Sequence, residues 1–338
     1  MSEVAPASGR LDVVGIGNAL VDVFSNEPHD FLAAHGLTAG AMALVDTERA
    51  EALYAAMGPG TESSGGSAAN TLVGLASFGG SGGFIGRVAD DQLGQVFGHD
   101  LRAAGVEFSA PPARDGSPSG RSLIVITPDA QRTMSTYLGA AGELGPDDID
   151  RSLLARAQVV YLEGYLWDEP PAKDAFRLAA RTAHEAGCRV ALTLSDAFCV
   201  DRHRADFLDL IEHEVDVLFA NEVEILSLYE VDQFDDALQR VGNHCEIAAL
   251  TRSEKGAVVV TRDEVHVIDA VATEVVDTTG AGDQFAAGFL YGLTHGYHLG
   301  VAGRLGALAA GEVISHVGAR PEVSFATLAA PLLAAHAG

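Results

Sequence analysis

The chain has 338 residues, of which 48% are hydrophobic, 7% aromatic and 20% charged. At roughly 150 residues per domain, this length allows about two folding units or one large unit with an appendage. The composition is typical of a globular protein and excludes disorder along most of the chain. With 21 Lys and Arg against 47 Asp and Glu, the formal net charge is −26. Such a field repels a phosphate backbone, so we expect no nucleic-acid partner.

Cysteine content and hydropathy predict the compartment. The chain holds three cysteines without a paired spacing, which favours a reducing cytoplasm over a disulfide framework. The first ten residues lack the basic and apolar regions of a signal peptide, and no apolar run reaches about 18 residues. We therefore expect a cytoplasmic protein with no membrane association.

Five short apolar runs are typical of buried strands: residues 11–17, 158–164, 189–195, 215–221 and 246–251. Helical patterns separate them, such as residues 172–187, which follow two prolines and end at a glycine. Strands alternating with helices predict an α/β fold, in which helices cover both faces of a mostly parallel central sheet. The expected architecture is a three-layer α/β/α core.

A second, smaller sheet is expected from separate pieces of chain. Residues 105–138 are turn-rich and contain a hairpin pattern with its turn at Pro128 and Asp129. Together with residues 18–25 and 40–46, they predict a discontinuous β lid on a single unit that spans residues 1–338. The glycine-dense residues 58–86 carry apolar side chains, so we interpret them as buried turns rather than as a linker.

Several common motifs are excluded. A Walker A loop needs Gly-Lys-Ser/Thr, and the only lysines are Lys173 and Lys255, the latter followed by glycine and alanine. The His-Glu pairs at His184 and His213 lack the second histidine of a zinc protease. Residues 15–20 half-match the dinucleotide fingerprint, with leucine in place of the third glycine. An oxidoreductase alternative depends on that match alone.

Residues 275–289 carry the strongest signal. We expect a strand to end in a tight small-residue turn, with Asp283 at the edge of a helix over residues 284–294. Glycines let a ligand approach the backbone, and the free N–H groups of a helix N-terminus bind anions. The pattern predicts a phosphate cradle containing a carboxylate. The alternative is an aspartate that only caps the helix.

Four motifs resemble the ribokinase (PfkB) family of sugar and nucleoside kinases. Residues 277–283 match its C-terminal signature and residues 64–70 its Gly-Gly signature. Residues 17–22 match its opening substrate motif and residues 221–224 its Asn-x-x-Glu motif. Residues 18–22, 64–67 and 161–167 are most similar to adenosine kinase-like members.

The resemblance implies how the phosphoryl group is transferred. Asp283 would accept the proton of the substrate hydroxyl, as a weak base kept ionised by the helix N-terminus. Backbone N–H groups of Gly280, Ala281 and Gly282 would form the anion hole. Arg132, on the second hairpin strand, would be a mobile cation that closes over the phosphates.

The resemblance also implies a substrate site. Asn18 and Asp22 would bind sugar hydroxyls, Gly65 and Gly66 would let the backbone approach the sugar, and Asn70 would add a hydrogen bond from the next helix.

Two features of residues 161–167 favour different substrates. Glu163 favours a free sugar, because an acid there can bind a hydroxyl. Tyr165 and Trp167 favour a nucleobase, through stacking.

For ATP and metals, the resemblance implies sites around the ends of other strands. Asn221 and Glu224 would organise Mg²⁺ through water. The alternative for this pair is a helix cap beside a solvated glutamate. Asp277 and Thr279, with residues 318–319, match positions where many members hold a monovalent cation, so potassium is a candidate cofactor.

The nucleotide loop departs from the family pattern. Thr251 and Gly256 would bound this loop, in which Ser253 replaces a glycine. The loop should still form if Ser253 has a negative φ. Ala307, in a helix rich in small residues, would border the adenine of ATP, unless those residues serve helix packing.

We therefore expect a kinase that uses ATP and Mg²⁺ to phosphorylate the hydroxymethyl group of a ribose-containing nucleoside, adenosine foremost. The alternative is a kinase of free ribose, fructose or a related sugar. An inactive binding protein on the same fold is disfavoured because Asp283 and its anion hole are intact. Exposed edges of the lid sheet allow either a monomer or a homodimer.

Overall fold

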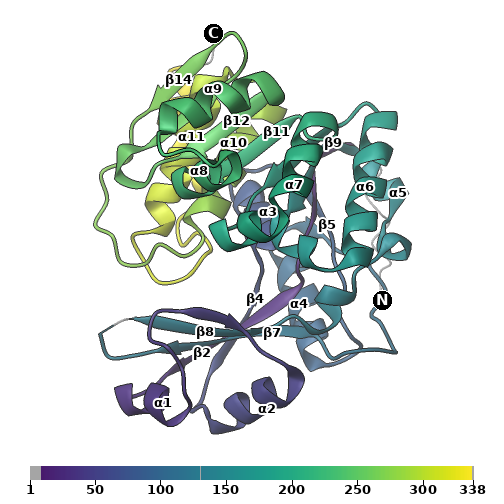
Figure 1. Ribbon diagram of the computed structural model, residues 1–338, viewed down its shortest axis with the longest axis vertical. Coiled ribbons are helices and arrows are strands. Elements are labelled where there is room, and N and C mark those ends of the chain that lie inside the picture. Colours follow the sequence, from purple (N-terminus) through teal and green to yellow (C-terminus); the bar gives the residue numbers. More distant parts are fainter. Residues whose placement is uncertain (1–8, 130, 337–338) are drawn as a thin grey trace.

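The computed structural model describes residues 9–129 and 131–336. The first eight residues, for which the sequence predicts no targeting segment, lie outside the described residues. Two β-sheets of unequal size organise the chain, with the smaller one at one end of the molecule (Figure 1). Within the described ranges, no helix combines the length and apolar character needed to cross a membrane.

The main sheet has nine strands in the order β14-β13-β12-β11-β10-β9-β1-β5-β6. Neighbouring strands run parallel from β12 to β6, and only β13 and β14 are antiparallel to their neighbours. The strands are β1 (Leu11–Ile16), β5 (Gly82–Ile85), β6 (Val106–Glu107), β9 (Ala157–Glu163), β10 (Arg189–Thr193), β11 (Val217–Asn221), β12 (Ile247–Thr251), β13 (Ala257–Val260) and β14 (Val265–Ile268). The five predicted strands are β1 and β9 to β12, so the predicted α/β class is confirmed.

Side chains alternate between two apolar cores, one on each face of the main sheet. On β1, Val13 belongs to one core and Val14 to the other, and the neighbouring strand β9 repeats this with Val159 and Val160. This alternation follows from the two-residue period of a strand. Helices α5 to α9 cover the Val14 face, and α3, α4, α10 and α11 cover the Val13 face. The predicted three-layer core is therefore present.

The helix predicted over residues 172–187 is α6 (Pro170–Glu185), and each of its ends differs from the prediction by two residues. The helices are α1 (His29–Ala34), α2 (Thr47–Ala56), α3 (Ser67–Ser77), α4 (Gln92–Ala103), α5 (Arg151–Leu154), α6 (Pro170–Glu185), α7 (Ala197–His213), α8 (Glu222–Tyr229), α9 (Phe234–His244), α10 (Ala281–Thr294), α11 (Leu299–Val313) and α12 (Phe325–Ala334).

The smaller sheet, which we call the lid, has the strand order β3-β8-β7-β2-β4. Its strands are β2 (Leu20–Asn26), β3 (Met42–Leu44), β4 (Thr61–Gly65), β7 (Gly120–Ile126) and β8 (Arg132–Tyr137). The predicted hairpin is β7 and β8. Two expectations were wrong. Residues 61–65 form a lid strand paired with β2 rather than a turn, and β6, inside the expected lid range 105–138, pairs with β5 in the main sheet.

The strand expected before the 277–283 motif is also absent. Val275 and Val276 are exposed, and the Val276 N–H donates to the carbonyl of Ile314 at the end of α11, 2.8 Å away. The segment therefore docks on a helix end instead of joining a sheet. As the sequence predicts, the cysteines form no disulfide; all three are buried and free.

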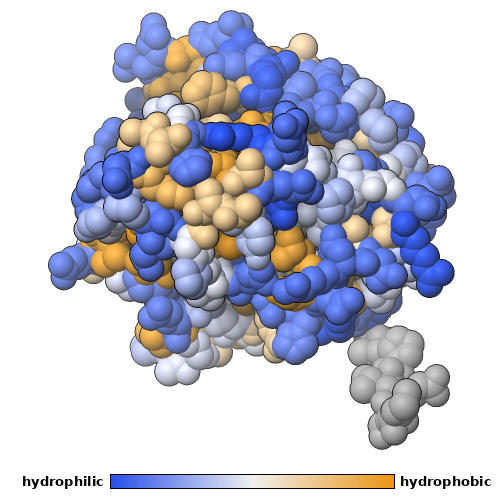
Figure 2. Space-filling model, turned by 90° about the horizontal axis from the view of Figure 1, so that it is seen from below, coloured by the Kyte–Doolittle hydropathy of each residue, from blue (hydrophilic) through white to orange (hydrophobic). Residues whose placement is uncertain are grey.

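The face on the lid side mixes apolar with polar residues (Figure 2). Met42 and Leu44 are 45% and 55% exposed on β3, an edge strand of the lid. An exposed apolar edge can pair with another strand. The expectation of a monomer or homodimer stays a prediction.

Leu72 allows a test of how α3 is held on the main sheet. Its side chain is fully buried. One δ carbon lies 3.0 Å from the position that a Cβ would take on Gly15 of β1, and the other lies 3.1 Å from that position on Gly82 of β5. Leu72→Ala should lower the free energy of unfolding by about 2–5 kcal/mol in urea titrations. Leu44→Ala, at an exposed leucine, should change it by less than about 0.5 kcal/mol. Equal effects would contradict this view of the core.

Candidate active site

The site is built around the N-terminus of α10. Gly280 is the N-cap with φ +78°, and a Cβ there would lie 2.6 Å from the side chain of Ala319, so both conformation and space require glycine. The helix begins at Ala281, three residues before the predicted start. The Ala281 N–H donates to the Thr278 carbonyl at 3.3 Å, which engages one of the three predicted anion-hole donors. Around Gly282 the space is open, because a Cβ there would meet no atom within 4 Å.

Asp283 points from the first turn of α10 toward α3. Ser67 Oγ donates to its Oδ1 at 2.6 Å, and Asn70 Nδ2 donates to its Oδ2 at 3.3 Å. Burial raises the pKa of Asp283 to about 6 against these two hydrogen bonds. Desolvation therefore makes this carboxylate more basic than a free one, whereas the sequence analysis considered only the helix N-terminus.

Arg320 is a site residue that the sequence analysis missed. Its Nε donates to Asn70 Oδ1 at 3.3 Å, so Asn70 links this guanidinium to Asp283. Gln284, also missed, donates from Nε2 to the Asn70 carbonyl at 3.0 Å. The only local signal for Arg320 is its place directly after residues 318–319. Within the described residues, its second terminal nitrogen is buried without a hydrogen-bond partner.

Asp22 lies near the same arginine. Burial raises the pKa of this carboxyl to about 7, although the positive charges of Arg320 and Arg132 oppose the rise, and Asp283 adds to it. The Asp283 carboxylate is therefore close enough to disfavour the ionisation of Asp22. We call the group around them the lid–core site: Asn18, Asp22, Asn70, Arg132, Asp277, Asp283 and Arg320.

The glycines before α3 make room for this site. A Cβ on Gly65 would lie 2.3 Å from Asp22 Oδ2, and one on Gly66 would lie 2.2 Å from the carbonyl oxygen of Asn18. Gly66 also has φ +96°. These residues were predicted to admit the sugar to the backbone. Their direct contacts are with Asp22 and Asn18, which they allow to pack against the start of α3.

Arg132 bridges the lid and the core. Its terminal nitrogen lies 2.8 Å from Asp277 Oδ2, and the two side chains are only 9% and 10% exposed. The expected free, mobile lid cation is therefore an ion-paired residue in this structure. Asp277 also accepts hydrogen bonds from Thr279 and from the Gly318 N–H. A monovalent cation at Asp277 and Thr279 would have to share this carboxylate with Arg132.

Glu163 ends β9 and is fully enclosed. Its Oε1 accepts from Asn18 Nδ2 at 2.7 Å and its Oε2 accepts from the Ala68 N–H at 2.9 Å. Burial raises its pKa to about 7 against these hydrogen bonds. Both oxygens are engaged, so its predicted use as a sugar ligand loses its support. Instead, among the described residues, Asn18 Oδ1 is buried without a partner.

The two aromatic residues after β9 named above, Tyr165 and Trp167, differ in burial. Trp167 is fully buried, donates to Asp206 at 3.0 Å and packs against two phenylalanines, so the expectation that it stacks on a base was wrong. Tyr165 is half-buried, and its hydroxyl donates to the Ser195 carbonyl at 3.3 Å. Burial raises the Tyr165 pKa, so its hydroxyl stays protonated.

The predicted ATP and magnesium residues lie at adjoining strand ends. Asn221 on β11 pairs in register with Thr251 on β12, at the carboxyl edge of the parallel sheet. Asn221 and Glu224 form a capping box at the start of α8, and burial raises the pKa of Glu224 to about 7. Glu224 is therefore a buried cap, not the solvated glutamate of the alternative.

The nucleotide loop forms in a conformation that the sequence did not predict. The sequence analysis made loop formation conditional on a negative φ at Ser253. The residue instead has φ +52°, in the left-handed region that the more usual glycine favours, and the loop still forms. A Cβ on Gly256, with φ +82°, would lie 2.0 Å from the Ile268 carbonyl. Ala307 is a buried member of the apolar core, and its neighbour Gly306 packs against Phe285 on α10. Helix packing therefore accounts for part of this small-residue stretch.

A family model for pfkB family carbohydrate kinases matches residues 32–325. The chain belongs to this family. An adenosine kinase from Sinorhizobium meliloti is 51% identical over 96% of this chain and all of that one, with a TM-score of 0.89. A probable sugar kinase from Rhizobium etli is 50% identical with the same TM-score, covering 96% of this chain and 99% of that one. A 5-dehydro-2-deoxygluconokinase from Geobacillus thermodenitrificans is 30% identical over 74% of this chain and 78% of its own length.

These findings establish an ATP-using kinase that phosphorylates a hydroxyl group of a sugar or nucleoside, and they bear out the predicted ribokinase-like fold. The kinase therefore contains the lid–core site at the junction of its two sheets. Six of the seven residues in this group were named as candidate site residues from the sequence, and Arg320 was not; their roles stay predictions.

The ion pair between lid and core gives a stability test. Arg132→Ala should leave the Asp277 carboxylate buried without its cation and lower the free energy of unfolding by about 3 kcal/mol or more. Urea unfolding of Arg132→Ala and of Arg121→Ala, a lid arginine beside the Tyr54 ring, makes the comparison. If the two variants are equally stable, the bridge contributes nothing particular to the fold.

Proposed function

We propose that this kinase transfers the γ-phosphoryl group of ATP to the hydroxymethyl oxygen of a ribose-containing nucleoside, adenosine foremost. The observation that carries the proposal is the buried Asp283 carboxylate, held by Ser67 and Asn70 at the N-terminus of α10. The 51% identity to an adenosine kinase over nearly the whole chain supports this choice of substrate.

In this proposal Asp283 acts as the base. Its Oδ atoms accept the hydroxyl proton as the substrate oxygen bonds to the γ-phosphorus and the bond to the β-phosphate oxygen breaks, releasing ADP. A pKa raised to about 6 leaves the group ionised at neutral pH and matches it better to proton transfer. Gly280 and Gly282 would contribute N–H groups to the developing charge, together with the dipole of α10.

Asn18 and Asp22 would bind the ribose. The partner-free Oδ1 of Asn18 can accept from one hydroxyl and Asp22 from another. Arg132 and Arg320 each have a terminal nitrogen that is buried without an acceptor among the described residues. These nitrogens are suited to the phosphoryl group or to a substrate oxygen.

ATP and Mg²⁺ would lie toward β11 and β12. The chemistry of the donor set fits the ion, because Mg²⁺ usually keeps several of its waters. Asn221 and Glu224 already hydrogen-bond to each other, so these two residues would hold the ion through its bound waters and not by direct coordination. When bound, Mg²⁺ neutralises charge on the β- and γ-phosphates. Thr251 and Gly256 would bound the nucleotide loop, and Ala307 would lie beside the adenine. Potassium near Asp277 and Thr279 remains part of the proposal.

Free sugars are the alternative substrates, supported by the similarity to the deoxygluconokinase and the probable sugar kinase. Glu163 no longer favours them, because its two oxygens bind Asn18 and the backbone of α3.

Asp283→Asn tests the proposed base. The amide keeps the size of the side chain but cannot take the proton, so kcat should fall on the order of 10²–10⁴-fold. In the wild type, kcat/KM should rise with pH through about 6, because the buried carboxyl must lose its proton before it can accept one. Asp236→Asn is the matched control, since Asp236 holds the same third position in α9 but is exposed. Turnover of Asp283→Asn near that of the control would remove Asp283 from the mechanism.

A substrate panel tests the choice of nucleoside. Adenosine, 2′-deoxyadenosine and ribose should be compared by ADP release. The deoxy analogue should lose about one to two orders of magnitude in kcat/KM, because a buried acceptor is left unpaired. Tyr165→Ala should weaken adenosine use but not ribose use, whereas Tyr54→Ala, at an exposed tyrosine on α2, should affect neither. Efficient use of ribose without adenosine would replace the nucleoside proposal with the sugar alternative.

A further inference from the structure

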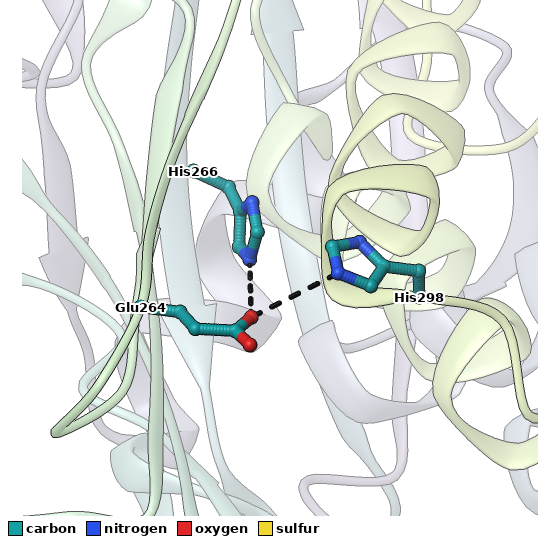
Figure 3. A group of neighbouring side chains, drawn as sticks. All are labelled: Glu264, His266 and His298. Atoms are coloured by element: carbon teal, nitrogen blue, oxygen red, sulfur yellow. Dashed lines mark hydrogen bonds and ion pairs between the residues drawn. The ribbon is translucent and has the colours of Figure 1, made fainter.

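Three potential metal ligands converge at the edge of the main sheet away from the lid (Figure 1). Glu264 directly precedes β14, and His266 lies two residues further on, so both side chains leave the same face of the chain. His298 comes from the N-cap of α11. One ligand atom of each lies within 4.8 Å of the other two (Figure 3).

The separations suit a small divalent ion. Glu264 Oε2 lies 3.0 Å from His266 Nε2 and 3.8 Å from His298 Nε2. In a tetrahedral site with bonds of 2.0–2.2 Å, two ligand atoms stand about 3.3–3.6 Å apart. These two distances bracket that range, and the ligand nitrogens of the two histidines lie within 4.8 Å of each other. Side-chain shifts of up to about 1 Å would therefore bring the three atoms onto one ion.

Within the described structure, the side chains of these three residues form hydrogen bonds and ion pairs only with one another and with one backbone N–H group. That group belongs to Gly300 and donates to His298 Nδ1 at 3.2 Å. The side chains of Glu264 and His298 are 54% and 64% exposed and that of His266 is 20% exposed, so an ion can reach them. Two imidazoles and a carboxylate form the donor set of many zinc sites, with a fourth position left for water.

We propose that Glu264, His266 and His298 form a binding site for Zn²⁺ or a similar first-row divalent metal. The ion joins the β13–β14 hairpin to the N-terminus of α11. The proposal concerns neither ATP nor the lid–core site and is independent of the proposed function.

The hydrogen bond of His298 sets a limit on the affinity. Because Nδ1 accepts from Gly300, neutral His298 carries its proton on Nε2, which faces Glu264. Metal binding through Nε2 requires this proton to move to Nδ1, which ends the bond to Gly300. The site should therefore bind Zn²⁺ more weakly than a closed structural zinc site does.

Calorimetric titration of ZnCl₂ into full-length protein tests the proposal. The protein should carry no histidine tag, be stripped with EDTA and dialysed, and be held in millimolar Mg²⁺ to mask oxygen-rich sites. We expect one Zn²⁺ per chain with a dissociation constant in the micromolar range or tighter. Co²⁺ should give the visible absorption of a four- or five-coordinate site at the same stoichiometry.

Three variants and a control assign the site. Glu264→Gln, His266→Ala and His298→Asn should each weaken Zn²⁺ binding about tenfold or more. Asparagine is a good N-cap, so the last change keeps an acceptor for the helix. His99→Ala is the control, because His99 is an exposed histidine paired only with the neighbouring Asp100. Melting temperatures in EDTA show that each variant is folded. Unchanged binding in folded variants, or wild-type binding no tighter than millimolar, would reduce the cluster to surface ion pairs and overturn the proposal.

Discussion

The buried Glu163 carboxylate is the interaction on which the geometry of the lid–core site depends. It ends a central strand and accepts from Asn18, just before lid strand β2, and from Ala68 in the first turn of α3. One side chain therefore fixes where the lid leaves the core and where the helix carrying Asn70 begins. Burial disfavours the ionised form, and the two hydrogen bonds oppose this. An apolar residue could fill the same space but could satisfy neither donor.

The lid is held a second time by the ion pair of Arg132 with Asp277. The two contacts are different in kind. Glu163 acts at the root of the lid, where β2 leaves the core, whereas Arg132 lies on β8 and meets the loop before α10. If the lid moves during turnover, the Arg132 pair can open while the Glu163 contacts stay in place. The arginine would then exchange one anionic partner for another, which compensates part of the cost of opening.

What the sequence predicts depends on how local each signal is. Parallel strands that are buried on both faces are continuous apolar runs in the sequence. The positions of the central strands could therefore be predicted accurately from the sequence. The strand of residues 61–65 is polar and exists through its pairing with β2, which no local pattern reveals. The raised pKa of Asp283 has the same origin, because desolvation is a tertiary effect that a helix-terminus argument omits. Arg320 belongs to the site only through its contact with Asn70, 250 residues away in sequence.

The net charge of −26 opposes the binding of a polyanion such as ATP, and local placement of cations decides the outcome. At physiological ionic strength, exposed charges further away than about 8 Å are largely screened, whereas buried or partly buried ones are screened much less. The two lysines lie toward the surface, paired with Asp206 and Glu222. Arg132 and Arg320 instead lie at the junction of the sheets, each with a buried terminal nitrogen that lacks an acceptor in the described structure. A phosphoryl group bound there would face these two cations at short range, which would offset the nearby carboxylates and the acidic surface.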